Sequence, residues 1–437
     1  LMPVWTAGLD NEFGEQAQPM IYDGVMYISN AKWTYAIDAL TGKQIWRTPT
    51  NFTSETPRVV CCGISNKGVA LYKGKVFRTT LDAHVIALDQ KTGKEIWKQK
   101  AAEWKEGYSM TVAPQIANGV VITGCSGAEF GARCFLDGWD PHTGKKLWRR
   151  YTTAGPGEKG HETWNPPEAY LHGGASTWIT GSYDPELDLV FWGTGNAGPW
   201  TDERRKGDNL YVATLLAIKP KTGEIAWHYQ FAPNDVWDWD SWENILGEVR
   251  MDGQMRKVVM HMHRGGFLYV LDRATGKLLS AQPYAKVNWA THVDLATGRP
   301  VESQVSRDLR AGKTVELFPG ILGAKNWPHA SFNPNTGLLY ATTNTVSSTY
   351  RFLKLQEYKP GLRYQGIENI SSPITPDTIA SHLEAIDPIT GKAKWRTPVK
   401  GQQLSAAMLT TGGGLLFTSR PTGEFIAVDV GNGQELW

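Results

Sequence analysis

The residues Ala87-Leu88-Asp89-Gln90-Lys91-Thr92-Gly93-Lys94-Glu95-Ile96-Trp97 form one copy of a pattern that recurs along this chain of 437 residues. The pattern is an apolar pair, Asp, two residues, Thr-Gly, three residues and Trp. Related copies occupy residues 36–46, 138–148, 217–227, 270–280, 385–395 and 427–437. The turn residues of successive copies lie 51, 51, 79, 53, 115 and 42 positions apart. A recurrence near 50 residues predicts stacked or radial repeats.

Each repeat reads as β structure. An alternating run such as 75–80 and a second short run such as 85–88 precede each turn, and a last strand is expected to start at the Trp. Glycine supplies the positive φ of the turn. Four short strands per repeat describe a propeller blade, and the Trp is placed to wedge between neighbouring blades as a docking motif.

One further copy is expected inside the interval of 115 residues, which brings the count to about eight blades. The predicted fold is therefore all-β, a single eight-bladed β-propeller domain over residues 1–437 with tryptophan docking motifs. Both ends look trimmed, and the last blade looks incomplete. The repeat alone fits an enzyme and a non-catalytic scaffold or binding platform equally well.

Composition excludes several classes of function. The formal charge is +2, from 45 basic and 43 acidic side chains, so there is no footprint for nucleic acid and no polybasic membrane anchor. No segment has the apolar length of a transmembrane span. The four cysteines lack zinc-site spacing. Their even number fits two disulfides in an oxidising compartment and also fits a cytosolic protein.

Two cysteine-containing segments interrupt the repeat. The adjacent Cys61 and Cys62 are either two buried thiols or a vicinal disulfide, whose strained ring would offer a rigid surface to a planar ligand. The segment Cys125-Ser126-Gly127-Ala128-Glu129 reads as a loop between two strand ends. A Cys125–Cys134 bridge could staple the loop that presents Glu129.

Two further segments carry oxygen donors. Gly193-Thr194-Gly195-Asn196 is a small-residue turn that ends in an amide. In Trp237-Asp238-Trp239-Asp240, an extended backbone would point both carboxylates to the same side. Two solvated carboxylates are the alternative, but the flanking tryptophans favour a shielded site. Hard oxygen donors of this kind select calcium or another hard cation and disfavour zinc and copper.

Together these segments resemble the pyrroloquinoline quinone (PQQ)-dependent, or quinoprotein, alcohol dehydrogenases, and the resemblance covers nearly the whole chain. The segments occur in the order of that family and at compatible spacings. The resemblance implies that Glu129, Asn196 and Asp238 bind the metal and that Asp238 is also the catalytic base. Asp240 resembles the additional carboxylate of the lanthanide-dependent branch, so one lanthanide(III) ion is favoured over Ca²⁺. Trp239 departs from the pattern, because Tyr is commoner there.

The same resemblance implies a set of contacts to PQQ. Trp178 would stack on one face of the quinone, and Cys61-Cys62 would cover the other. Because PQQ carries three carboxylates, its pocket needs cations and hydroxyl donors. The remaining expected contacts are Glu15, whose register is uncertain by one residue, with Lys67, Thr111, Ser126, Gly127, Ala128, Ser176, Arg264, Asn326 and Trp327. Lys67 stands where many members have Arg, and the two cations are not equivalent.

The activity implied is oxidation of an alcohol to an aldehyde or ketone by hydride transfer. The metal would act as a Lewis acid on the quinone, and Asp238 would accept the alcohol proton. No CxxCH haem-attachment sequence occurs in the chain, so a separate cytochrome c or a quinone would accept the electrons, and a fused cytochrome domain beyond Trp437 stays open. The family context also implies the bacterial periplasm, an exported protein and a homodimer.

The resemblance leaves the substrate open. A tryptophan of methanol-oxidising members is missing around Ser405-Ala406-Ala407, and the insertions 281–318 and 345–384 could shape the pocket mouth. These departures favour an alcohol larger than methanol. A polyol, sugar or polymer alcohol is the main alternative. A non-catalytic propeller scaffold is the alternative of another class, although a scaffold has no use for the oxygen donors and the adjacent cysteines.

Overall fold

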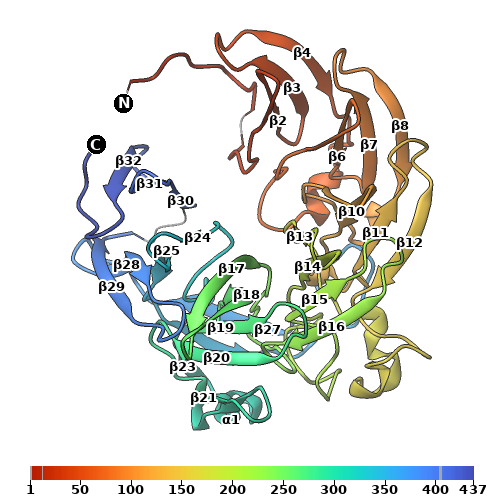
Figure 1. Cartoon of the computed structure of the whole chain (residues 1–437). Coiled ribbons are helices and arrows are strands. Elements are labelled where there is room, and N and C mark those ends of the chain that lie inside the picture. Colours follow the sequence, from red (N-terminus) through yellow and green to blue (C-terminus); the bar gives the residue numbers. More distant parts are fainter. Residues whose placement is uncertain (1, 12, 403–405) are drawn as a thin grey trace. The chain divides into compact units, whose positions relative to one another are not determined.

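The computed structural model describes residues 2–11, 13–402 and 406–437. Figure 1 labels the strands along the chain. The chain divides into two compact units. The first unit comprises Leu1–His228 and Gln356–Gln365, and the second comprises Tyr229–Leu355 and Gly366–Trp437.

In the first unit, the described residues form four antiparallel sheets of four strands, each in sequence order. The strands are β1 (Met20–Tyr22), β2 (Val25–Ser29), β3 (Trp33–Asp38) and β4 (Gln44–Pro49); β5 (Ala70–Tyr72), β6 (Lys75–Thr79), β7 (His84–Asp89) and β8 (Glu95–Lys100); β9 (Gln115–Ala117), β10 (Val120–Gly124), β11 (Phe135–Trp139) and β12 (Lys146–Tyr151); and β13 (Ser182–Asp184), β14 (Leu189–Gly193), β15 (Thr214–Ile218) and β16 (Ile225–Gln230). Short 3₁₀ helices lie between strands: η1 (Thr56–Val59), η2 (Trp104–Glu106), η3 (Ala128–Phe130), η4 (His161–Thr163) and η5 (Pro167–His172). The predicted four strands per repeat are confirmed here.

In the second unit, two four-stranded sheets and one three-stranded sheet follow the repeat over the described residues. They contain β17 (Ile245–Met251), β18 (Gln254–Met262), β19 (Phe267–Asp272) and β20 (Leu278–Pro283); β24 (Ser331–Asn333), β25 (Leu338–Asn344), β28 (Ile379–Ile386) and β29 (Ala393–Lys400); and β30 (Leu409–Thr410), β31 (Leu415–Ser419) and β32 (Phe425–Asp429).

The long interval between the turns at Thr275 and Thr390 does not hold a hidden repeat, so that prediction is wrong. Its added length forms a hairpin, a helix and a separate three-stranded sheet of order β23-β26-β27. These elements are β21 (Ala290–Asp294), β22 (Arg299–Glu302), α1 (Gln304–Arg310), β23 (Val315–Leu317), β26 (Ser348–Phe352) and β27 (Ile367–Ser371). Length was mistaken for a repeat because two insertions together are as long as one blade.

The repeated turn is closed by its own Asp and Thr. Asp89 Oδ1 accepts hydrogen bonds from the Thr92 backbone N–H and hydroxyl, each at 2.8 Å, and Gly93 N–H donates to Asp89 O at 2.8 Å. The hydrogen bonds from Thr92 lower the pKa of Asp89. Gly93 has a φ of 70°, which favours glycine. Strand β8 begins two residues before Trp97, earlier than predicted, because the turn is complete directly after its glycine.

The repeated tryptophan contacts the turn of the following sheet. Trp46 Nε1–H donates to Gln90 O at 3.1 Å, and its ring lies on Gly93, where an added Cβ would be 2.5 Å from the ring. Trp97, Trp148 and Trp395 bond in the same way to the carbonyl that follows the first turn position, and their rings lie on Gly144, Gly223 and Gly433. Trp5 makes the same contact with Ala39 and Gly42. Trp5 lies outside the repeat, so the sequence pattern gave no sign of this contact.

The hydrophobic core lies between successive sheets. One cluster joins Phe77 and Val85 of the second sheet to Val121 and Phe135 of the third, with Trp97 between them. The inner strands of these sheets, such as β7, β10 and β11, are therefore buried along most of their length. Among the described residues, no helix has the length and apolarity needed to cross a membrane.

Replacing Gly93 with Ala tests the contact between Trp46 and the turn. We expect Gly93→Ala to lower the free energy of unfolding by about 3 kcal/mol, because an unfavourable φ and a clash with the indole ring add together. Gly74→Ala is the matched control, with a φ of 74° and open space around the added Cβ. It should cost only about 1 kcal/mol. Equal losses in urea unfolding would show that the indole contact contributes nothing.

Candidate active site

All the residues singled out from the sequence lie at the same end of the strands of their own sheet. In an antiparallel sheet of order 1-2-3-4, the start of the first strand and the connection between the second and third strands lie at the same end of the strands. Each residue occupies one of these two places, and the turns that precede the repeated tryptophans lie at the opposite end. Before a first strand lie Glu15, Cys61, Cys62, Lys67, Thr111, Ser176, Trp178, Asp238, Asp240, Asn326 and Trp327, and in a second connection lie Ser126, Gly127, Ala128, Glu129, Asn196 and Arg264.

In the first unit, four expected cofactor residues come together. Lys67 Nζ lies 4.8 Å from the centre of the Trp178 ring and 3.3 Å from Thr111 Oγ1. Thr111 Oγ1 lies 3.4 Å from Ser126 Oγ. The residue Lys67 is partly buried, and burial of its ammonium lowers its pKa to about 7. An aromatic ring beside a cation and two hydroxyl groups suits the binding of a planar anion.

Gln16 belongs to this cluster, although the sequence pointed to Glu15. Gln16 Oε1 accepts from Lys67 Nζ and from Ser65 Oγ, both at 3.0 Å. Glu15 is exposed, and its Oε1 accepts from Asn11 Nδ2 at 2.9 Å. The expected contact of Glu15 with the cofactor stays a prediction, and its register remains uncertain by one residue.

The segment that carries Ser176 also holds the Asn196 turn. Ala175 N–H donates to Asn196 O at 2.8 Å, and Gly195 N–H donates to Ser176 O at 2.6 Å. Gly174 has a φ of 75°, and an added Cβ would lie 2.8 Å from Asn196 O. The buried Asn196 side chain donates from Nδ2 to Ala197 O at 3.1 Å, which fixes the orientation of its amide.

Glu129 lies in η3, inside the loop between β10 and β11 that the sequence predicted. Gly127 precedes η3 with a φ of 133°, and an added Cβ would lie 2.3 Å from Gly107 O. Gly198, beside Asn196, leaves only 2.9 Å between an added Cβ and Ala128 O. Close approach at glycines therefore brings the Glu129 loop and the Asn196 turn into contact.

The cysteines behave differently from one another. Cys61 and Cys62 form the predicted vicinal disulfide, and Cys62 is exposed. The expected Cys125–Cys134 staple is not formed, because both residues are buried free thiols. Cys125 Sγ instead accepts from Phe135 N–H at 3.4 Å, and burial raises the pKa of Cys134. The loop is held without a covalent bridge.

In the second unit, Asp238 and Asp240 converge on Arg264. Arg264 donates from Nη1 to Asp240 Oδ2 at 2.9 Å and from Nη2 to Asp238 Oδ2 at 3.4 Å. Burial lowers the pKa of Arg264, but the two carboxylates outweigh burial and the net shift is upward. Two carboxylates therefore lie within hydrogen-bonding distance of one guanidinium in this unit.

The backbone at Asp238 differs from the extended segment that was expected. Asp238 has a φ of 66°, so strand alternation is not what aligns the two carboxylates. The flanking Trp237 and Trp239 are fully buried and stack with ring centres 4.9 Å apart. Asp235 Oδ1 accepts from both their backbone N–H groups at 3.2 Å. Asp240 is 5% exposed, so its carboxylate is shielded from solvent, and its place in a metal site stays a prediction.

Asn326 and Trp327 follow a buried ion pair that sequence reasoning missed. Lys325 Nζ lies 2.9 Å from Glu243 Oε2, and both side chains are almost fully buried. Lys325 Nζ also donates to Pro328 O at 2.7 Å, and Asn326 Oδ1 accepts from Trp327 N–H at 2.8 Å. No sequence signal joins Lys325 to Glu243, because the two lie far apart in the chain.

The oxygen ligands expected for a metal fit a hard cation by type. Among the described ranges, no group of three or more His, Cys, Asp or Glu side chains is arranged to hold a metal ion. The residue Ser405 lies outside the described residues, so the missing tryptophan near it has no structural account here.

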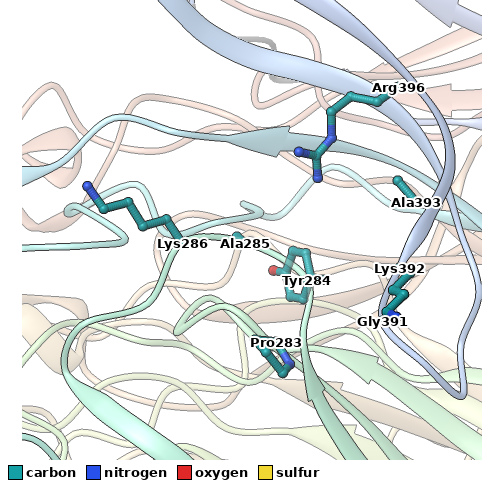
Figure 2. A pocket seen from close by; sticks show the side chains of 8 residues that line it. All are labelled: Pro283, Tyr284, Ala285, Lys286, Gly391, Lys392, Ala393 and Arg396. Atoms are coloured by element: carbon teal, nitrogen blue, oxygen red, sulfur yellow. The ribbon is translucent and has the colours of Figure 1, made fainter.

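A pocket of about 650 Å³ in the second unit is separate from these residues (Figure 2). Lys286, Lys392 and Arg396 line it beside Tyr284, whose hydroxyl donates to His263 O at 2.8 Å. Arg396 also pairs with the buried Glu384 at 3.0 Å. None of the residues predicted from the sequence lines this pocket.

Comparisons with known proteins agree with the arrangement. The family model described as the glucose/ethanol/alcohol dehydrogenase β-propeller domain of the PQQ family matches residues 4–288. A quinohemoprotein alcohol dehydrogenase, ADH IIB, of Pseudomonas putida is 40% identical over 99% of this chain and 65% of its own length. The quinoprotein alcohol dehydrogenase PedH of Pseudomonas putida is 38% identical over 100% of this chain and 77% of its own.

Solved structures give the same result. A europium-containing methanol dehydrogenase superposes with a TM-score of 0.94 at 34% identity, over 99% of this chain and 79% of that one. The quinohemoprotein alcohol dehydrogenase of Comamonas testosteroni gives a TM-score of 0.89 at 33% identity, over 97% and 66%. The chain belongs to the PQQ-dependent quinoprotein alcohol dehydrogenase family and has its all-β propeller fold. It spans about two thirds of the quinohemoprotein relatives.

The position of Lys67 predicts a pH dependence of PQQ binding. With a pKa of about 7, the Lys67 amine is charged at pH 6 and mostly neutral at pH 8 in the free protein. Affinity for the anionic PQQ should therefore fall as pH rises from 6 to 8, by about tenfold if one charge-assisted hydrogen bond is lost. Fluorescence titration measures this change. Lys67→Met should flatten the profile, and the exposed Lys73→Met should not. An unchanged slope in Lys67→Met would contradict the assignment.

Proposed function

We propose that this chain is the propeller of an enzyme that oxidises an alcohol to an aldehyde or ketone with PQQ and one metal ion. The observation that carries the proposal is the cluster of Lys67, Trp178, Thr111 and Ser126 in the first unit. It combines a ring for stacking with a cation and hydroxyls for carboxylates. A scaffold needs none of these features.

The residues also fit a cation by their chemistry. We propose Glu129, Asn196, Asp238 and Asp240 as its oxygen ligands, from the match to the family and from the chemistry of their donor atoms. Asp238 and Asp240 share Arg264 as a hydrogen-bond partner. When bound, PQQ and the cation supply the electrophilic carbonyl that accepts a hydride from the alcohol carbon.

The chain itself positions the reactants and takes the proton. Asp238 accepts the proton of the alcohol hydroxyl as the general base. Arg264 fixes the direction of Asp238 and Asp240 through its two nitrogens. Asp240 and the neighbouring Trp237 and Trp239 are buried, and exclusion of water strengthens these electrostatic interactions.

A lanthanide is the proposed metal, with Ca²⁺ as the alternative. Asp240 provides one carboxylate more than a divalent ion requires, and a trivalent ion balances it. The europium-containing methanol dehydrogenase is one of the similar structures. Which metal ion this chain binds depends on its own ligand residues, so Asp240 is the residue to substitute.

The wider setting is proposed from the family and the disulfide. The substrate is a small-molecule alcohol larger than methanol, with polyols and sugars as alternatives, and a separate cytochrome c or quinone takes the electrons. The Cys61–Cys62 disulfide supports an exported protein in the bacterial periplasm. A homodimer stays a prediction.

The finer description of the fold is also a proposal. We infer one propeller domain over residues 1–437, with tryptophan docking as the contact between blades and eight blades in the complete protein. The indole contacts at Gly93, Gly144, Gly223 and Gly433 support the docking motif. The number of blades stays a prediction, because the repeat is followed here by six four-stranded sheets and one three-stranded sheet within the described residues.

Reconstitution tests the function. Metal-free protein given PQQ and lanthanum should oxidise alcohols in a dye-linked assay over a short panel, with little activity in calcium. Activity with calcium alone would retain the enzyme and exclude the lanthanide. Absence of both activity and PQQ binding with either metal, in the full-length protein, would mean that the chain is a scaffold.

Asp240→Asn separates the two metals. The amide keeps the volume and an oxygen towards Arg264 but removes one charge, so affinity for lanthanum should fall at least about tenfold while calcium affinity changes much less. Calorimetric metal titration of the PQQ-loaded protein measures both affinities. Equal losses for the two metals would show that the charge of Asp240 does not select between them.

A further inference from the structure

The segment Gln356–Gln365, here called the strap, connects β26 and β27 of the inserted sheet. By its contacts the strap belongs to the first unit, although the residues on both sides of it in the sequence belong to the second. Connecting segments usually run over the surface and are more mobile than the strands they join. This insertion instead packs onto the loop that carries Glu129.

Two backbone hydrogen bonds tie the end of the strap to the first unit. Tyr364 N–H donates to Glu129 O at 2.7 Å, and Trp200 N–H donates to Gln365 O at 2.8 Å. The first bond is made to Glu129 itself. The second is made four residues after Asn196, in the turn that contacts the Glu129 loop. The strap therefore holds the backbone beside both proposed metal ligands of this unit.

Aromatic contacts hold the middle of the strap. The Tyr358 ring stacks on His172 with centres 3.6 Å apart and planes inclined by 24°. His172 Nδ1 lies 3.2 Å from Gly131 O, and because a carbonyl only accepts, Nδ1 carries the proton. Tyr358 and Tyr364 also enclose Gly131, which ends η3, since an added Cβ would lie 3.0 Å from one ring and 3.2 Å from the other.

We propose that the strap is a positioning element for the metal ligand Glu129 and sets the affinity of the metal site. Its contacts keep the turn from Ala128 to Gly131 in the one backbone conformation that presents the Glu129 carboxylate. Residues behind the ligands of a metal site often control affinity in this way. The inference rests on the proposed function, because it takes Glu129 as a metal ligand.

Reciprocity gives the proposal a second readout. If the strap strengthens metal binding, the metal must stabilise the strap by the same coupling free energy. Lanthanum added to the PQQ-loaded protein should therefore slow amide hydrogen exchange over 356–365, above all at the Tyr364 amide that donates to Glu129 O. This measurement needs no variant, so it stands even if a substitution fails to fold.

Substitutions in the strap test the affinity. Tyr358→Ala should weaken lanthanum binding to the PQQ-loaded protein by about tenfold in calorimetric titration, with PQQ affinity unchanged. Tyr358→Phe keeps the stacked ring and should restore the affinity. Leu362→Ala is the matched control in the same strap, since Leu362 is 58% exposed, and it should bind lanthanum like the wild type.

The outcomes separate the strap from the function it rests on. Wild-type metal affinity in Tyr358→Ala, together with a loss in Glu129→Gln, would overturn the strap and leave the metal site standing. A wild-type chain that binds no metal, or a Glu129→Gln variant that binds as well as the wild type, would overturn both. Unchanged hydrogen exchange over the strap on addition of lanthanum would also overturn the proposal.

Discussion

The contact of a tryptophan ring with the glycine of the next turn is the interaction on which the structure of each unit depends. The contact of Trp46 with Gly93 is one example. The ring leaves no room for a Cβ at residue 93, and Trp46 Nε1–H donates a hydrogen bond to Gln90 O. This contact holds successive sheets together at one end of their strands. The connections at the opposite end do not make this contact, and they vary in length and carry polar groups.

That division explains where the proposed functional residues lie. Each of them precedes the first strand of a sheet or lies in the connection between its second and third strands. All of them are therefore at the end of the strands opposite the tryptophan turns. Each unit contributes its own group of polar residues. In the first unit, Lys67 beside Trp178 suits a planar anion, and in the second, Asp238 and Asp240 share Arg264 and offer carboxylate oxygens.

The sequence predicted the repeated features well and the unique ones poorly. The Asp89–Gly93 turn, the four strands and the vicinal disulfide follow from local rules. The interval before Thr390 was misread because two insertions imitate one repeat in length. The strap, the thiol state of Cys125 and the pairing of Glu243 with Lys325 depend on contacts between distant residues. Such contacts leave no periodic signal.

Crystallography of the PQQ-loaded protein with lanthanum, with anomalous scattering recorded for the metal, tests the central claim most directly. The account predicts one anomalous peak bound by the oxygens of Glu129, Asn196, Asp238 and Asp240, with PQQ on the face of Trp178. A peak bound by other residues, or PQQ held away from Trp178 and Lys67, would contradict it.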